Sequence, residues 1–244
     1  MIKLLILLSV LLCCVIATTY PPPLIKPVNN VHLVDSKEYY LNMVRDTWST
    51  IEKEHGWFNF KLKDIVQDVQ ESIYGFELNG TVTYKNGFLK SLHHMSVADD
   101  GIQQVWTCNA YGCSVMLRGS TKMADVDLVF DVEVSREGKE PLFYSSTYRH
   151  STIEFNMNII KNYTTSALSV ESHLVALSAG KDEKMTFHPS DHVTQLIQRG
   201  YKSSLNADAG VSAWATDIIV PAMKRVMGRT RPFPDLCYNC PAKL

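Results

Sequence analysis

Several sequence patterns that identify enzymes are missing from this chain. It has no Gly-x-Ser-x-Gly nucleophile turn, no His-Glu-x-x-His pair and no glycine-rich phosphate loop. His93 and His94 are adjacent, so on a strand they would point to opposite faces and could not hold one metal ion together. We therefore expect a protein that is not an enzyme, with no catalytic residues, no metal and no cofactor.

The chain also lacks an excess of charge and a long apolar run. Its 24 Lys and Arg and 25 Asp and Glu residues give a formal net charge of −1. A nucleic-acid partner usually requires a basic face, so this balance argues against one. After residue 17 no segment reaches the ~18 apolar residues of a membrane-spanning helix. We expect neither a nucleic-acid partner nor an integral membrane segment.

The first seventeen residues have the pattern of a signal peptide. Lys3 precedes an apolar run from Leu4 to Ile16, and Ala17 ends a cleavage site of small residues. We therefore expect the mature protein to be secreted and extracellular. Residues 18–34 contain three consecutive prolines and are predicted to form an extended leader rather than part of the core.

Cleavage of that signal would leave four of the six cysteines. Four cysteines allow three disulfide connectivities, and secreted chains usually oxidise them. A four-residue turn separates Cys108 from Cys113, so a disulfide across this hairpin is geometrically easy. Cys237 and Cys240 would then close a small loop in the tail, residues 230–244. A bond from the tail to the hairpin is the alternative.

Helical periodicity is found near both ends of the chain. Residues 36–55 carry the apolar stripe Tyr40, Val44, Trp48 and Ile51, with Ser36 available as a cap. A second short helix is predicted over 61–73. Residues 190–227 repeat apolar side chains every 3.6 positions and predict one long C-terminal helix, weak at 206–210 and kinked at Pro221.

Between the helices the apolar period changes from 3.6 to 2, which is typical of strands with one buried face. In residues 124–134 the predicted inward side chains are Ala124, Val126, Leu128, Phe130, Val132 and Val134. In the strand that returns, Ile153, Phe155, Met157 and Ile159 face inward and alternate with Glu154, Asn156, Asn158 and Ile160. Two glycosylation sequons begin at Asn79 and Asn162, and both asparagines fall on the outward parity.

This order of elements predicts the fold class. When one face of a sheet is exposed to solvent, another element must cover its apolar face. The C-terminal helix is the longest element available for that purpose. We expect one elongated α+β domain over residues 35–229. In it a long curved antiparallel sheet wraps around the C-terminal helix, and the N-terminal helix packs beside it.

Three stretches resemble a known family. They are Gly80-Thr-Val-Thr-Tyr-Lys-Asn-Gly-Phe-Leu89, the acidic alternating strand 124–134, and Ile219-Val-Pro-Ala-Met-Lys-Arg-Val-Met227. They resemble the group-seven mite allergens most closely. These allergens share a lipid-binding fold with arthropod juvenile-hormone-binding and takeout proteins and with bactericidal/permeability-increasing protein. The resemblance covers roughly residues 36–228.

The resemblance implies an apolar groove between the sheet and the C-terminal helix. Its occupant would be a fatty acid, a terpenoid or a similar molecule, with Tyr84 and Tyr201 as candidates for fixing its orientation. The alternative is a secreted interaction protein with a packed core that binds a macromolecular or microbial-surface partner. The candidate ligand-binding residues are Val82, Tyr84, Met95, Leu128, Phe130, Val132, Phe155, Met157, Ile159, Ile197, Tyr201, Leu205, Trp214 and Ile218.

We predict that the protein leaves the cell cleaved near Ala17 and glycosylated on Asn79, Asn162 or both. Intact mass spectrometry before and after enzymatic deglycosylation measures both events. Asn79→Gln and Asn162→Gln should each remove the mass of one glycan if both sites are used. Recovery of an uncleaved, unglycosylated chain from the cytosol would contradict the prediction.

Overall fold

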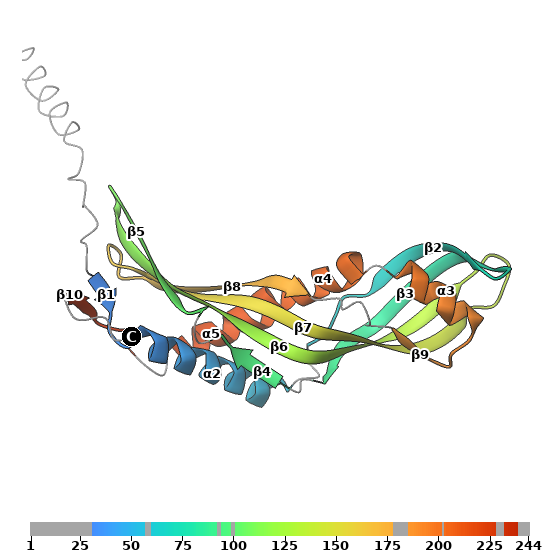
Figure 1. Ribbon diagram of the computed structural model, residues 1–244, viewed down its shortest axis with the longest axis horizontal. Coiled ribbons are helices and arrows are strands. Elements are labelled where there is room, and N and C mark those ends of the chain that lie inside the picture. Colours follow the sequence, from blue (N-terminus) through green and yellow to red (C-terminus); the bar gives the residue numbers. More distant parts are fainter. Residues whose placement is uncertain are drawn as a thin grey trace, which may run out of the picture.

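The computed structural model describes residues 31–56, 60–91, 94–98, 101–177, 185–201, 203–227 and 232–238. They form an elongated α+β structure built on a large antiparallel sheet (Figure 1). The strands are β1 Val31–Leu33, β2 Ile65–Ile73, β3 Phe76–Ser91, β4 His94–Val97, β5 Gln103–Asn109, β6 Gly112–Ser135, β7 Leu142–Asn162, β8 Leu168–Leu177, β9 Thr186–His188 and β10 Leu236–Tyr238. The helices are α2 Ser36–His55, α3 His192–Gly200, α4 Ser203–Trp214, the π-helical η3 Ala215–Ile219 and α5 Val220–Met227.

The large sheet is ordered β2-β3-β6-β7-β8, and β4, β5 and β9 pair with parts of β6 or β7. Strands β6 and β7 have 24 and 21 residues and run most of the length of the molecule (Figure 1). A separate two-stranded sheet joins β1 to β10, so the two ends of the described chain lie together. The predicted α+β class with a long antiparallel sheet is confirmed.

The two long strands change the parity of their inward side chains midway. In β6, Leu117 and Met123 are buried before Asp125, whereas Val126 and Leu128 are buried after it. Asp125 has a positive φ of 51°, which is typical of an irregular residue in a strand such as a β-bulge. Because the side-chain period is two, one such residue moves all later side chains to the other parity. Ala124, predicted to be inward, is therefore only half-buried, and Met123 takes the inward position.

The outward face of β7 is less exposed to solvent than predicted. Asn156 and Asn158 have only 8% and 5% of their surface exposed, although they alternate with the apolar inward residues. Strands β6 and β8 flank β7 on both sides, and Asn156 Nδ2 lies 3.1 Å from His173 Nε2. Asn79 is exposed, and Asn162 is half-buried with its side-chain oxygen accepting bonds from the amides of the two threonines that follow Tyr163.

The first predicted helix is confirmed, and its capping differs. Helix α2 spans the predicted residues and buries its apolar stripe in the core. Its N-cap is Asp35 in a left-handed backbone conformation, with no side-chain cap bond. The Ser36 hydroxyl instead accepts a 2.6 Å bond from Gln104 Nε2, and the Gln104 Oε1 accepts from the amide of Leu33. These bonds join the start of α2 to β5.

The predicted helix over 61–73 is wrong, because residues 65–73 form strand β2. This strand pairs with β3 along its whole length, from Ile65 opposite Tyr84 to Ile73 opposite Phe76. Its burial alternates with period two around the buried Val69. The long-range pairing outweighs the weak local preference for a helix.

The predicted single C-terminal helix is also wrong. Asp191 caps α3 with a reciprocal capping box to Thr194, and at Tyr201 the backbone turns extended, with φ −68° and ψ 126°. Helix α3 packs on β2 and β3, whereas η3 and α5 pack on β8 and α2. Figure 1 shows these two parts over different regions of the twisted sheet. One straight rod could not follow both regions, so the break at Tyr201 lets each part pack separately.

The expected distortion near Pro221 takes the form of the π-helical turn η3. Proline lacks an amide hydrogen, and its ring clashes with the carbonyl four residues earlier in a regular α-helix. The five-residue π turn, Ala215–Ile219, ends two positions before Pro221 and widens the helix there. Among the described residues, the helices do not include one that is both long and apolar enough to cross a membrane.

The hairpin disulfide Cys108–Cys113 is present, as predicted. Cys237 in β10 is also disulfide-bonded. Its predicted partner, Cys240, lies outside the described residues. The amide of Val34 donates a 3.0 Å bond to the carbonyl of Asp235, which adds to the pairing of the two chain ends.

We predict that Tyr40→Phe lowers the free energy of unfolding by about 1 kcal/mol, because a buried hydrogen bond is lost. The Tyr40 hydroxyl donates a 2.8 Å bond to the carbonyl of Met157 and so joins α2 to the inner face of β7. Tyr39→Phe is the matched control, since the buried Tyr39 hydroxyl has no hydrogen-bond partner in the described structure. Denaturant unfolding of both variants tests this difference, and equal losses would contradict it.

Candidate ligand-binding site

The predicted ligand-binding residues lie in the interior, on the inner face of the sheet and on the helices that cover it. Met95, Tyr201 and Ile218 are half-buried, and the side chain of Leu205 lies outside the described residues. The others have at most 1% of their surface exposed: Val82, Tyr84, Leu128, Phe130, Val132, Phe155, Met157, Ile159, Ile197 and Trp214. They are therefore core residues, divided between the two regions that α3 and α4–α5 cover.

The first region contains a group of aromatic side chains around Tyr201. The ring centroids of Tyr84 and Tyr201 are 5.4 Å apart, and those of Tyr148 and Tyr201 are 5.1 Å apart. Tyr84 also packs edge-on against Phe130, at 5.8 Å. This group joins β3, β6 and β7 to the junction between α3 and α4.

Two phenol groups in this region are buried without a partner. The hydroxyls of Tyr84 and Tyr201 are both inaccessible and make no hydrogen bond within the described structure. Burial raises the pKa of each phenol, and that of Tyr201 is raised further by nearby Tyr84, Tyr148 and Asp208. Both groups are therefore neutral at physiological pH and able to donate a hydrogen bond.

The second region contains Trp48, Phe60 and Trp214. Phe60 stacks on Trp48 at 6.4 Å and meets Trp214 edge-on at 5.0 Å. The Trp214 indole Nε1 donates a 2.9 Å bond to the carbonyl of Lys61. Helix α4 is thereby attached to residues 60–64, which we call the strap.

The strap runs between the sheet and the C-terminal helix. The amide of Leu62 donates to the carbonyl of Gly87 at 2.6 Å, and the amide of Leu89 donates to the carbonyl of Phe60 at 3.0 Å. Only glycine fits at residue 87, because a Cβ there would lie 2.6 Å from Phe130 Cε1 and 2.9 Å from Leu62 Cβ. Leu62 and Phe130 therefore both lie close to Gly87.

Two hollows open on either side of the strap. The first, which we call the helix pocket, has a volume of about 250 Å³. It contains Trp214 and Ile218, and its lining is Lys61, Leu62, Lys63, Gly210, Ala213, Trp214, Asp217 and Ile218. The second hollow has about 410 Å³ and also touches Lys61 and Leu62, together with Asp64 and residues 86–88. The helix pocket is thus where two predicted residues reach a surface opening.

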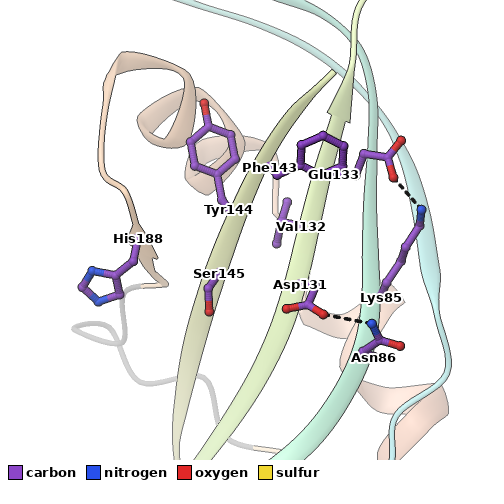
Figure 2. A pocket seen from close by; sticks show the side chains of 9 residues that line it. All are labelled: Lys85, Asn86, Asp131, Val132, Glu133, Phe143, Tyr144, Ser145 and His188. Atoms are coloured by element: carbon purple, nitrogen blue, oxygen red, sulfur yellow. Dashed lines mark hydrogen bonds and ion pairs between the residues drawn. The ribbon is translucent and has the colours of Figure 1, made fainter. Parts of the chain in front are cut away.

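A third hollow, of about 440 Å³, opens on the outer face of the sheet (Figure 2). Its polar groups largely pair with one another: Lys85 with Glu133 at 2.5 Å and Asn86 with Asp131 at 2.9 Å. Phe143, 66% exposed, supplies its apolar surface. The predicted residue Val132 also lines this hollow, although its side chain is buried between Asp131 and Glu133.

Tyr144 also lines the outer hollow, and burial together with a hydrogen-bond partner raises the pKa of its hydroxyl. Its hydroxyl donates a 2.9 Å bond to Asp191 Oδ2. Burial first, and then this carboxylate, raise the pKa of Tyr144 to about 12.

In the described ranges, three or more His, Cys, Asp or Glu side chains do not come together as a metal site.

The sequence analysis missed the strap and Phe143. The helix predicted over 61–73 includes most of the strap, and the four-residue spacing of Ile65, Val69 and Ile73 fits a helix as well as a strand. Phe143 becomes part of a hollow only through the pairing of β7 with β6, which local pattern does not reveal.

No family model and no curated protein sequence matches this chain. Among solved structures it is similar to one titled "Crystal structure of lipopolysaccharide binding protein", with a TM-score of 0.40 and 12% sequence identity. That similarity covers 80% of this chain and 42% of the other, so this chain spans less than half the length of that protein. The likeness is distant.

We predict that Trp214→Phe loosens the strap, because phenylalanine keeps an aromatic ring but loses the bond to the Lys61 carbonyl. Hydrogen–deuterium exchange should accelerate in a peptide covering residues 60–64. Peptides from β6 and β7 should exchange as in the wild type and serve as the internal control. Unchanged exchange in the strap would show that the indole bond does not hold it.

Proposed function

We propose that this protein is a secreted, non-enzymatic carrier of a small apolar ligand such as a fatty acid or a terpenoid. The ligand lies between the inner face of the sheet and the C-terminal helices. It reaches this position through the helix pocket. The supporting observation is that the pocket extends from the surface to Trp214, which belongs to the aromatic core.

The lining of the helix pocket suits an amphipathic occupant. Leu62, Trp214 and Ile218 supply apolar surface, while Lys61, Lys63 and Asp217 lie at the same opening. Binding would come mainly from apolar area, at about 25 cal/mol per Å² removed from water. The volume of about 250 Å³ is below the usual range for a ligand site, so a longer ligand must also displace core side chains.

The core has side chains that can make such room. Met43, Met123, Met157 and Met223 are buried along the interior. Methionine is unbranched and polarizable, and it repacks around irregular shapes more easily than branched residues do. A core of this kind can exchange packing between side chains for packing against a ligand.

The outer hollow favours the second candidate, a protein that binds a macromolecular or microbial-surface partner. Phe143 is exposed there among paired polar groups, and the tip of the β2–β3 hairpin exposes Tyr74 and Phe76. Exposed aromatic rings with a polar rim are typical of protein interfaces. In this case small apolar molecules would not bind, and association would depend on Phe143.

The test compares Ala213→Phe with Ser212→Phe. Ala213 lines the helix pocket, whereas its neighbour Ser212 is exposed and does not. We expect Ala213→Phe to weaken binding of an uncharged apolar dye, N-phenyl-1-naphthylamine, about tenfold, equivalent to about 1.4 kcal/mol. Ser212→Phe should bind as the wild type does.

Circular dichroism must first show that both variants are folded. Equal dye affinity in the two folded variants would show that access is not through the helix pocket. Absence of any uptake of dye or fatty acid by the wild type would overturn the carrier proposal. Loss of partner association in Phe143→Ser would then support the second candidate.

A further inference from the structure

We propose that Tyr84 and Tyr201 form a site that recognises an oxygen atom of the ligand, at the inner end of the proposed ligand position. Their hydroxyls would donate hydrogen bonds to an uncharged oxygen acceptor, such as an ester or ketone carbonyl, on an otherwise apolar ligand. This inference rests on the proposed carrier function and adds the chemical class of the ligand.

The two hydroxyls are the central observation. Buried polar groups in folded proteins nearly always have a hydrogen-bond partner, and a hydroxyl left without one is costly. Here two such hydroxyls belong to rings that touch each other, Tyr84 and Tyr201, with centroids 5.4 Å apart. Their proximity indicates a shared partner that is supplied from outside the protein.

Two other buried tyrosines of the core have a hydrogen-bond partner within the protein, whereas the buried Tyr39 hydroxyl does not. Tyr40 donates to the carbonyl of Met157, and Tyr144 donates to Asp191. Tyr84 is as fully buried as Tyr40, yet its hydroxyl makes no such bond. Phenylalanine would fill the same space at Tyr84 without this cost, so the hydroxyl is better explained by a ligand than by packing.

The surroundings favour an uncharged acceptor over a carboxylate. The side chains found in ring contact with the two tyrosines are Phe130 and Tyr148, and neither carries a positive charge. The negative charge of Asp208 acts on Tyr201 and would repel a second anion. An ionised carboxylate would lose its hydration there, and the described side chains in ring contact with the two tyrosines would not supply a compensating positive charge.

A continuous path of side chains joins the phenols to the helix pocket. Tyr84 packs on Phe130, and Phe130 and Leu62 both lie close to Gly87. Leu62 in turn lines the helix pocket beside Trp214. A ligand with its oxygen at the phenols would therefore extend its apolar part along Phe130 and Leu62 toward the pocket.

The side chain of Tyr201 makes no hydrogen bond in the described structure that ligand binding would break. Its ring is half-buried, and its backbone is in the extended break after α3 rather than in a helix. Its hydroxyl has no bond to break in the described structure. A ligand oxygen that accepts from Tyr201 would therefore displace no hydrogen bond of that side chain.

The test measures how strongly three ligands of similar length displace N-phenyl-1-naphthylamine. The ligands are methyl dodecanoate, dodecanoic acid at neutral pH, and tridecane. We expect the wild type to bind the ester about tenfold more tightly than the alkane, as one or two added hydrogen bonds would give. The ester should also bind more tightly than the ionised acid.

The variants Tyr84→Phe and Tyr201→Phe should each reduce the preference for ester over alkane about threefold or more, and should bind the alkane as the wild type does. Tyr39→Phe is the matched control, because it also removes a buried unpaired hydroxyl but lies outside this group. It should keep the full preference. The melting temperatures of the unliganded Tyr84→Phe and Tyr201→Phe proteins should stay equal to the wild type or rise.

The outcomes separate this inference from the proposed function. Wild-type protein that takes up dye but binds ester and alkane equally would overturn the recognition site and leave the carrier function standing. Wild-type protein that takes up none of the probes would overturn both. The contrary result is a melting temperature of the two phenylalanine variants that falls as much as that of Tyr40→Phe. That result would show that the hydroxyls of Tyr84 and Tyr201 make stabilising hydrogen bonds within the protein, and it would overturn the recognition site.

Discussion

The paired strands β6 and β7 are the constraint on which the other elements depend. They are joined along almost their whole lengths, from Ser114 opposite Asn162 to Val134 opposite Leu142. Their inner faces carry mainly apolar side chains, which must be removed from water. Because this surface is long and twisted, several helices are needed to cover it. The positions of α2, α3 and the α4–α5 helix follow from that need.

Buried tyrosine hydroxyls of this core differ in whether they have a hydrogen-bond partner. The hydroxyl of Tyr40 holds α2 to β7, and the hydroxyl of Tyr144 binds the residue that caps α3. In both cases a phenol connects a helix or its cap to the sheet. The hydroxyls of Tyr84 and Tyr201 connect nothing in the described structure. Since all these groups are buried and neutral, the difference lies in their partners and not in their protonation.

The outer face of the sheet has the opposite chemistry. Arg149 binds both oxygens of Asp127, at 2.7 and 3.1 Å, and Lys122 lies 3.6 Å from Glu154. Ion pairs with exposed partners add little to stability. They keep this face hydrated and discourage association of the sheet with other chains. The hollow beside the strap differs from this face, because the buried apolar side chains of Leu62 and Trp214 line it.

Local pattern by itself determined the α+β class, helix α2, and the inward faces around Phe130 and Phe155. In each case the period of apolar residues records which side of an element is buried, and that record is local. Only the tertiary structure decided that residues 65–73 are a strand, that the C-terminal helix breaks at Tyr201, and that Tyr84 meets Tyr201. The physical reason is that each of these depends on where distant segments pack along a twisted sheet. Periodicity says that a face is covered, but not which part of the chain covers it.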